Sequence, residues 1–147
     1  MKIYLGTDHA GFALKEKLKQ WLGEWGHEVE DLGAYELNEQ DDYPDFIASV
    51  AKAVAKDPEN RRGIVLGGSG QGEAMVANRF RGVRATVYYG GSMDILRLSR
   101  EHNDANILSL GARFLKDDEA KEAVKLWLGT SFSGEERHER RIAKLDV

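Results

Sequence analysis

An apolar run passes directly into a glycine-rich loop in the segment Gly63-Ile64-Val65-Leu66-Gly67-Gly68-Ser69-Gly70-Gln71-Gly72-Glu73. The pattern predicts a buried strand over Ile64–Leu66 and a helix over Ala74–Phe80. Glycines just before a helix allow backbone amides to approach an anion closely, and the helix dipole assists. The alternative is a tight turn without a ligand, although one or two glycines suffice for a turn.

The same alternation of apolar runs and amphipathic stretches extends in both directions from this loop. One predicted helix stops at Gly26, and another is entered through Pro44. Crossovers of this length form right-handed units, so we expect an α/β fold with a mostly parallel sheet and helices on both faces. The predicted strands are Ile3–Leu5, Val29–Leu32, Ile64–Leu66, Val83–Tyr88 and Ile107–Leu110.

Length and composition narrow the class of protein. The 147 residues suggest one domain over 1–147, and the absence of cysteine excludes a disulfide framework and a thiol nucleophile. A net charge of −4 argues against a nucleic-acid partner. The sequence has neither an apolar run of the ~20 residues that a membrane helix needs nor a signal peptide. We therefore expect a cytoplasmic protein without a membrane partner.

Glu73 indicates which kind of anion site the loop favours. A Walker A loop needs lysine at this position, and a dinucleotide fingerprint starting at Gly70 needs glycine or alanine where Met75 stands. A carboxylate beside donors for an oxyanion instead favours proton abstraction next to a carbonyl group. The structural alternative is a carboxylate that the helix dipole merely stabilises.

Polar residues also follow other strands at the edge of the sheet where ligands bind in such folds. Asp8 and His9 follow the first strand, although Asp8 could simply cap a helix. Arg113 follows the last strand, where it could meet a phosphate or remain a rim charge. His102 and Asn103 end a helix, and a lone histidine on an apolar face is more often structural. That predicted apolar face consists of Ile95, Leu98 and Ser99.

The C-terminus is the one basic region of the chain. Its cations alternate with three glutamates, which indicates a solvated helix with pairs of opposite charge. Arg137 and Arg141 lie four apart, so on a helix both guanidiniums project from one face and can bind one phosphate. The basic residues are Arg137, His138, Arg140, Arg141 and Lys144.

Taken together, these motifs resemble the ribose-5-phosphate isomerase B / galactose-6-phosphate isomerase subunit family. The resemblance spans nearly the whole chain in order. The matching segments are Gly6–Phe12, Asp42–Pro44, Gly63–Glu73, Ala77–Asn78, Gly82–Ala85, Ser99–Asn106 and Arg137–Arg141.

The resemblance implies a three-layer α/β/α Rossmann-like sandwich with a five-stranded parallel sheet. It also implies a homodimer, able to pair further, in which the C-terminal helix reaches across to complete the partner's site. The implied reaction interconverts ribose 5-phosphate and ribulose 5-phosphate by ring opening and proton transfer through a cis-enediolate. We expect neither a cofactor nor a metal, because no pair of histidines has the spacing of metal ligands and backbone amides alone can hold an enediolate.

The resemblance further implies roles for individual residues. Glu73 would be the base, and His102 would open the sugar ring with help from Asp8. The developing enediolate would lie against Asn103 and the loop residues Gly68, Ser69, Gly70, Gln71 and Gly72. The phosphate would meet His9, Arg113, Arg137 and Arg141, with the last two given by the second subunit. Tyr43 and His138 match the pattern near the site.

One departure and two alternatives accompany this expectation. Many relatives carry a cysteine base at the position of Gly67, but this chain has no cysteine. It therefore resembles the subgroup in which a glutamate at the start of the following helix is the base. The sugar could instead be allose 6-phosphate, galactose 6-phosphate or a tetrose phosphate. A non-catalytic, phosphate-binding flavodoxin-like module is the alternative from another class. A receiver domain of that kind needs an aspartate and a lysine where Gly67 and Gly111 stand.

Overall fold

Five parallel strands form the centre of the fold, in the order β2-β1-β3-β5-β4. The computed structural model describes all residues 1–147. The strands are β1 (Lys2–Thr7), β2 (Glu28–Asp31), β3 (Arg61–Gly67), β4 (Ala85–Tyr88) and β5 (Ile107–Gly111). The expected five-stranded parallel sheet is confirmed.

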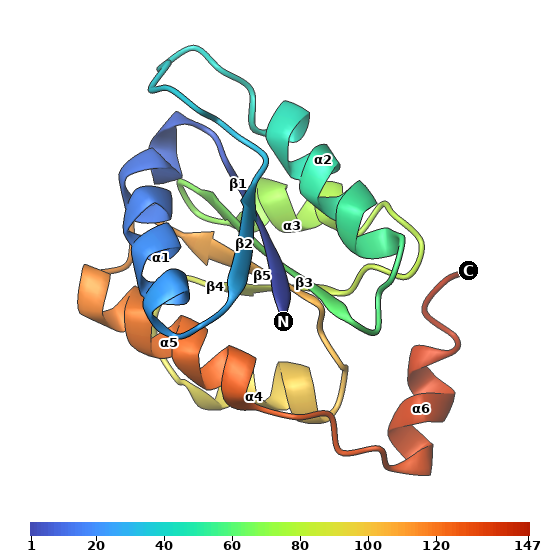
Figure 1. The fold of residues 1–147 in the computed structure, drawn as a ribbon. Coiled ribbons are helices and arrows are strands. Elements are labelled where there is room, and N and C mark those ends of the chain that lie inside the picture. The colour runs from blue at the N-terminus through green and yellow to red at the C-terminus, as the bar shows by residue number, and fades with distance from the viewer.

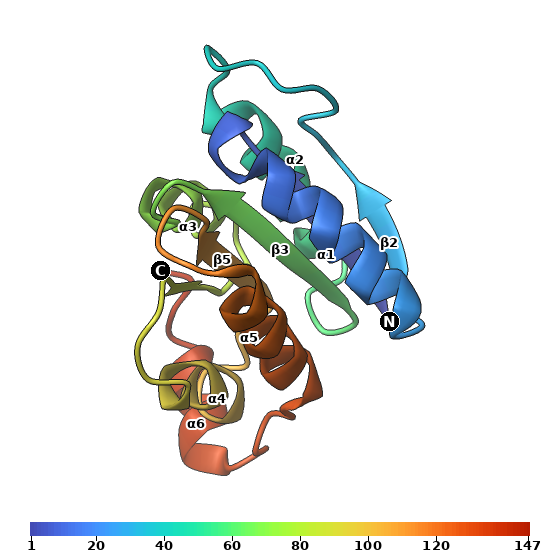
Figure 2. The ribbon, with the colours of Figure 1, turned by 90° about the vertical axis from the view of Figure 1, so that its left-hand side faces the viewer.

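Helices cover both faces of this sheet, as the two ribbon views show (Figures 1 and 2). One face carries α1 (Phe12–Glu24), α4 (Asp94–Glu101) and α5 (Asp117–Gly129). The opposite face carries α2 (Tyr43–Ala55) and α3 (Gln71–Ala77). A short 3-10 turn, η1 (His9–Gly11), joins β1 to α1, and α6 (Glu136–Ile142) lies apart from the layers. The expected three-layer sandwich is therefore confirmed.

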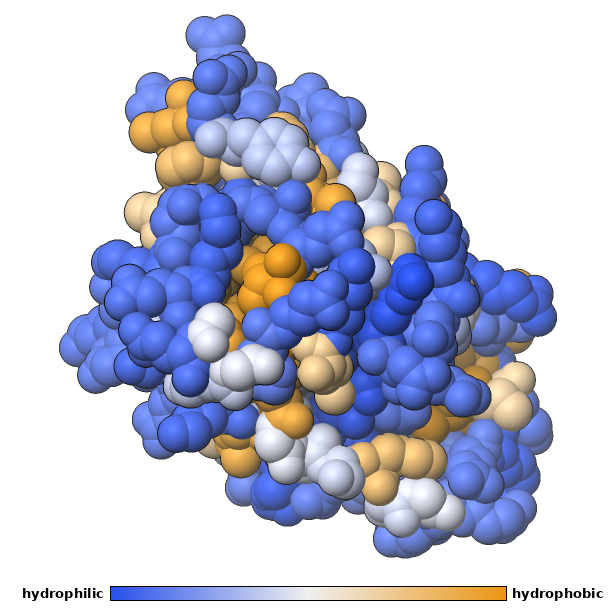
Figure 3. Space-filling model, viewed as in Figure 1, coloured by the Kyte–Doolittle hydropathy of each residue, from blue (hydrophilic) through white to orange (hydrophobic).

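Alternate residues of the strands feed two separate cores. Ile3 and Leu5 pack into the cluster under α1, α4 and α5, whereas Tyr4 between them packs under α2 and α3. Strands that are buried on both faces read as continuous apolar runs, which is the pattern that the sequence showed. No helix is both long and apolar enough to cross a membrane. On the face drawn in Figure 3, hydrophobic residues appear in small groups among hydrophilic ones.

Glycines in the left-handed region mark the end of α1 and the start of α3. Gly26, with φ +84°, follows the end of α1, as expected. Gly70, with φ +81°, caps α3 in the left-handed region, which glycine tolerates without steric cost. The helix consequently begins at Gln71 rather than at Ala74, so the predicted start was three residues late. Glu73 lies in the first turn of α3.

The predicted apolar face of α4 was wrong for Ile95 and Leu98, although Ser99 of the same predicted face is buried. Ile95 and Leu98 are 54% and 36% exposed, whereas Leu96 is fully buried. The helix turns Leu96 and Arg100 inward because the Arg100 guanidinium donates to the carbonyls of Ala105 and Thr130. A hydrogen-bonded arginine thus occupies a position that hydrophobic periodicity reads as polar and outward.

The strand order places a crevice at the carboxyl ends of β1 and β3. From β1 the chain continues to β2, which pairs with one side of β1. The next strand, β3, pairs with the opposite side of β1, so the direction in which strands are added reverses between β1 and β3. Ligands of open α/β sheets bind at such a switch point. The register pairs Thr7 with Leu66, so Asp8 follows β1 at the level of Gly67.

A buried ion pair ties α1 to the end of β2. The Lys15 side chain is fully buried, and its Nζ lies 2.7 and 2.8 Å from the two Asp31 carboxylate oxygens and 2.5 Å from the Ala34 carbonyl oxygen. Burial alone raises the pKa of Asp31, but hydrogen bonds from Lys15, the Gly33 amide and Lys19 outweigh it and hold that pKa below its ordinary value.

Replacing Lys15 with alanine should lower the free energy of unfolding by roughly 3 kcal/mol, because it leaves a half-buried carboxylate with a weaker partner. Urea denaturation measures the change. Lys17→Ala is the matched control: it removes an exposed pair with Asp117 and should cost no more than about 1 kcal/mol. Equal losses in the two variants would contradict a structural role for the buried pair.

Candidate active site

A cavity of about 510 Å³ opens at the carboxyl ends of β1, β3 and β5. Its volume suits a small-molecule ligand. All of its lining residues except Ala10 and Phe114 were expected from the sequence. The lining consists of Asp8, His9, Ala10, Tyr43, Gly68, Ser69, Gly72, Glu73, Arg113 and Phe114.

The Glu73 carboxyl group lies in a space left open by Gly67. A Cβ atom built on Gly67 would be 1.8 Å from Glu73 Oε1 and 2.1 Å from its Cδ, far inside van der Waals contact. Glu73 as a residue is only 4% exposed. The absence of a side chain at Gly67 therefore leaves the space that the carboxylate occupies. Any side chain at position 67 would force Glu73 out of this orientation.

Burial raises the pKa of Glu73, and the negative charge of Asp8 raises it further, while the backbone amides of Glu73 and Gly70 act in the opposite direction. The net direction is upward from the ordinary value of a carboxyl group. A general base works best when its pKa lies near the working pH, so this environment suits Glu73 to accept a proton from carbon.

Replacing Gly67 with alanine should lower kcat by roughly 10²-fold with little change in KM, because misplacing a catalytic group by about 1 Å has effects of this size. The clash is with the flexible end of Glu73, so we expect the fold to survive. Steady-state kinetics with circular dichroism test this. Gly23→Ala in α1, where a Cβ meets nothing within 4 Å, is the control and should keep full activity. Normal kcat in Gly67→Ala would show that activity does not depend on this position of the Glu73 carboxylate.

Asp8 faces the same cavity and also has a structural task. Its Oδ1 accepts a hydrogen bond from the Ala10 amide at 2.9 Å and so caps η1, which was the structural alternative considered from the sequence. Its Oδ2 lies 4.0 Å from His9 Nδ1. One carboxylate oxygen thus shapes the turn and the other faces the histidine.

Two large side chains close over the glycine loop. A Cβ on Gly72 would lie 2.5 Å from the Tyr43 hydroxyl oxygen, and a Cβ on Gly68 would lie 3.1 Å from an Arg113 guanidinium nitrogen. The glycines therefore admit Tyr43 on one side and the exposed Arg113 on the other.

Gly70 and Gln71 belong to the same loop but do not line the cavity. Gly70 makes the left-handed turn, and Gln71 faces a separate hollow with Met75 and Arg79.

The remaining expected residues lie elsewhere on the chain. His102 follows α4, and its ring stacks on His138 of α6 with centroids 4.2 Å apart and planes at 17°. Burial lowers the pKa of His138, with His102 and Arg137 adding to the effect. Asn103 lines a different cavity, of about 390 Å³. Arg137 and Arg141 are exposed on α6.

Topology explains why these residues do not meet Glu73. The crossover from β4 to β5 sends α4 back toward the amino ends of the strands. His102 therefore lies at the amino ends of the strands, whereas Glu73 lies at their carboxyl ends. Figure 2 shows α4 and α6 together at the end of the molecule away from α2. One chain brings together Glu73, Asp8 and the glycine loop, but neither His102 nor the C-terminal arginines.

Comparison with known proteins places this cavity in context. The Ribose/Galactose Isomerase family model matches residues 3–145. Ribose-5-phosphate isomerase B of Mycolicibacterium paratuberculosis is 41% identical over 97% of this chain and 87% of its own. The crystal structure of ribose-5-phosphate isomerase B from Mycoplasma genitalium with bound ribulose-5-phosphate has a TM-score of 0.93 at 38% identity, over 98% of this chain and 93% of that one. The Clostridium thermocellum enzyme of the same name has a TM-score of 0.91 at 45% identity, over 99% and 95%. The chain belongs to the Ribose/Galactose Isomerase family.

Proposed function

We propose that this chain interconverts ribose 5-phosphate and ribulose 5-phosphate. The observation that carries the proposal is the buried carboxylate of Glu73, seated over Gly67 beside the glycine loop, with a pKa above its ordinary value. The relatives support the choice of sugar, since they are named ribose-5-phosphate isomerase B and one was solved with ribulose-5-phosphate.

In the forward direction, Glu73 takes the proton from C2 of the open-chain aldose and returns it to C1, while the proton of the C2 hydroxyl group passes to the C1 oxygen, so that the carbonyl group moves from C1 to C2. The intermediate enediolate carries its charge on an oxygen, which backbone amides of the glycine loop stabilise. His9 and Arg113 line the same cavity and provide cations for the phosphate. Since the product is an isomer of the substrate, the reaction needs no net donor or acceptor of electrons.

We further propose that a second copy of the chain supplies His102 for ring opening, Asn103 for the enediolate, and Arg137 and Arg141 for the phosphate, with His138 supporting His102. This assignment is supported by the placement of these residues at the opposite edge of the sheet from Glu73. Exposed apolar side chains on α3, on α4 and after β4 and β5 offer surface for such a contact. They are Met75, Ile95, Tyr89 and Phe114, each more than half exposed.

A coupled assay over four-, five- and six-carbon aldose phosphates tests the substrate. We expect ribose 5-phosphate to give the highest kcat/KM. A higher value for allose 6-phosphate, galactose 6-phosphate or a tetrose phosphate would keep the mechanism but change the sugar, and no turnover of any of them would overturn the proposal. A cytoplasmic location stays a prediction.

A further inference from the structure

Asp41 was not singled out by the sequence, yet it makes the closest contact to a cavity residue. It lies in the segment between β2 and α2, with a side chain that is 7% exposed. Its Oδ1 accepts a hydrogen bond from the His9 backbone amide at 3.0 Å and lies 2.7 Å from His9 Nδ1. One buried carboxylate oxygen therefore holds both the backbone and the ring of His9.

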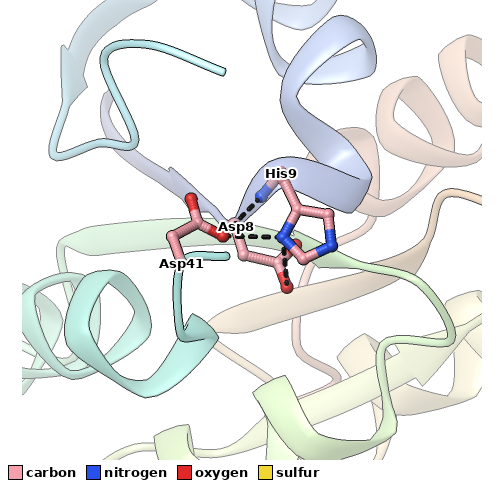
Figure 4. A group of neighbouring side chains, drawn as sticks. All are labelled: Asp8, His9 and Asp41. Atoms are coloured by element: carbon pink, nitrogen blue, oxygen red, sulfur yellow. Dashed lines mark hydrogen bonds and ion pairs between the residues drawn. The ribbon is translucent and has the colours of Figure 1, made fainter. Parts of the chain in front are cut away.

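This contact decides where the protons of the His9 ring lie. A carboxylate oxygen can only accept, so Nδ1 carries a proton whether the ring is neutral or charged. Figure 4 shows the other ring nitrogen pointing away from Asp41. A neutral ring would then offer only a lone pair at Nε2, which repels a phosphate oxygen. Only the imidazolium form offers an Nε2–H donor to an anion.

The charges around the ring favour that form. The hydrogen bond to Asp41 raises the pKa of His9, burial lowers it, Asp8 and the charge of Asp41 raise it, and Arg113 lowers it. The net direction is upward. The charged groups that face the ring are Asp8, which precedes His9 in the chain, Asp41 from the β2–α2 segment and Arg113 after β5. The two carboxylates raise the pKa of His9 more than the one guanidinium lowers it.

We propose that Asp41 is a positioning residue that orients His9 and keeps it as an imidazolium, with Nε2–H directed at the phosphate of the substrate. The inference rests on the proposed function, because it takes the ligand to be a sugar phosphate. Asp41 touches the histidine rather than the substrate and acts through it. It resembles the carboxylate partners that fix histidine tautomers elsewhere in proteins.

The geometry favours protons over a bound cation between these side chains. Asp8, His9 and Asp41 each offer an atom within 4.8 Å of the others, which a metal ion could bridge. The 2.7 Å separation of Nδ1 and Oδ1 is a direct hydrogen-bond length, and the same oxygen also accepts the backbone amide. We therefore expect exhaustive chelation to leave phosphate binding unchanged. Affinity that falls with EDTA and returns with a divalent ion would overturn the assignment.

Asp41→Asn is the decisive variant, since asparagine keeps an oxygen for Nδ1–H but removes the charge. We expect KM for ribose 5-phosphate and the dissociation constant of inorganic phosphate to rise roughly 3- to 10-fold at a pH between the His9 titration midpoints of the parent protein and the variant, since charge-assisted hydrogen bonds are about twice as strong as neutral ones. We expect kcat to change little. Glu39→Gln, an exposed change of equal charge in the same segment, should behave as the parent protein.

NMR titration of the histidine ring protons gives a readout that a purely structural role would not move. In the unaltered protein His9 should titrate at higher pH than His27, whose pKa burial lowers. In Asp41→Asn the His9 titration should move to lower pH, and phosphate affinity should begin to fall at that lower pH, because the imidazolium is lost as pH rises through its pKa.

The proposal is overturned if His9 titrates no higher than His27 in the unaltered protein, or if Asp41→Asn lowers kcat while KM and phosphate affinity stay constant. The titration of the unaltered protein needs no variant, so it can contradict the proposal even if Asp41→Asn folds poorly. Phosphate binding and the titration are also independent of turnover. A protein inactive on every sugar phosphate that still shows both effects would refute the proposed reaction but not the role of Asp41.

Discussion

Glu73→Gln should bind substrate and fold as the parent protein does but lose roughly 10²–10⁴ in kcat, the usual contribution of a positioned base. Glutamine has nearly the same shape, so it can occupy the space over Gly67. It cannot accept a proton from carbon. Solvent-exchange experiments test the step directly, because the parent enzyme should exchange the C2 proton of the substrate with solvent and the variant should not.

The pH dependence supplies a second test of the same residue. Glu73 acts as a base only when ionised, so kcat should fall as pH drops through its pKa. Because burial and Asp8 raise that pKa, the fall should begin at a higher pH than for an exposed glutamate. The residual activity of Glu73→Gln should lack this acid limb. Near-normal kcat in the variant, with proton exchange intact, would assign the base to another residue.

Stability should move in the opposite direction from activity. A carboxyl group with a raised folded-state pKa lowers stability once pH exceeds its unfolded-state pKa, because the folded state then holds a charge that it solvates poorly. Glu73→Gln removes this cost at neutral pH, so its Tm should equal or exceed that of the parent protein. A lower Tm would indicate that Glu73 has a structural role and would weaken the kinetic interpretation.

The sequence predicted the parts of the site that are contiguous along the chain. The glycine loop and Glu73 form one segment, and their spacing fixes which backbone amides and which carboxylate meet. Asp41 has no such signal, because it lies outside any periodic stretch and meets His9 across 32 positions. Only the folded chain shows that pair. The same limit explains Arg100, whose burial depends on carbonyl partners that periodicity does not reveal.

The position of His102 could be reasoned from topology, but not from motifs. The resemblance implied one site containing both Glu73 and His102, and motif matching is blind to which edge of a sheet a residue occupies. A helix that joins two parallel strands must end at the amino edge of the sheet. His102 follows such a helix and so lies at the amino ends of the strands. Glu73 follows the loop at the carboxyl ends, so one chain cannot bring the two residues together.

Mixing two inactive variants should restore activity. We propose that each site takes Glu73 from one chain and Arg141 from the other, so homodimers of Glu73→Gln and of Arg141→Ala should both be nearly inactive at low substrate. In a mixed dimer, one site collects both defects and the other site is intact. Each mixed dimer should therefore show about half of the parent activity, by the logic of two-fold symmetric interfaces.

Co-refolding equal amounts of the two variants should recover about a quarter of parent activity, because random pairing makes about half of the dimers mixed. Mixing Glu73→Gln with Asp8→Asn is the matched control. These two residues line the cavity of one chain, so every site of a mixed dimer keeps one defect and no activity should return. If hybrids of Glu73→Gln and Arg141→Ala form, as differently tagged chains would show, yet recover nothing, the arginines of α6 act within their own chain and α6 must swing toward its own cavity.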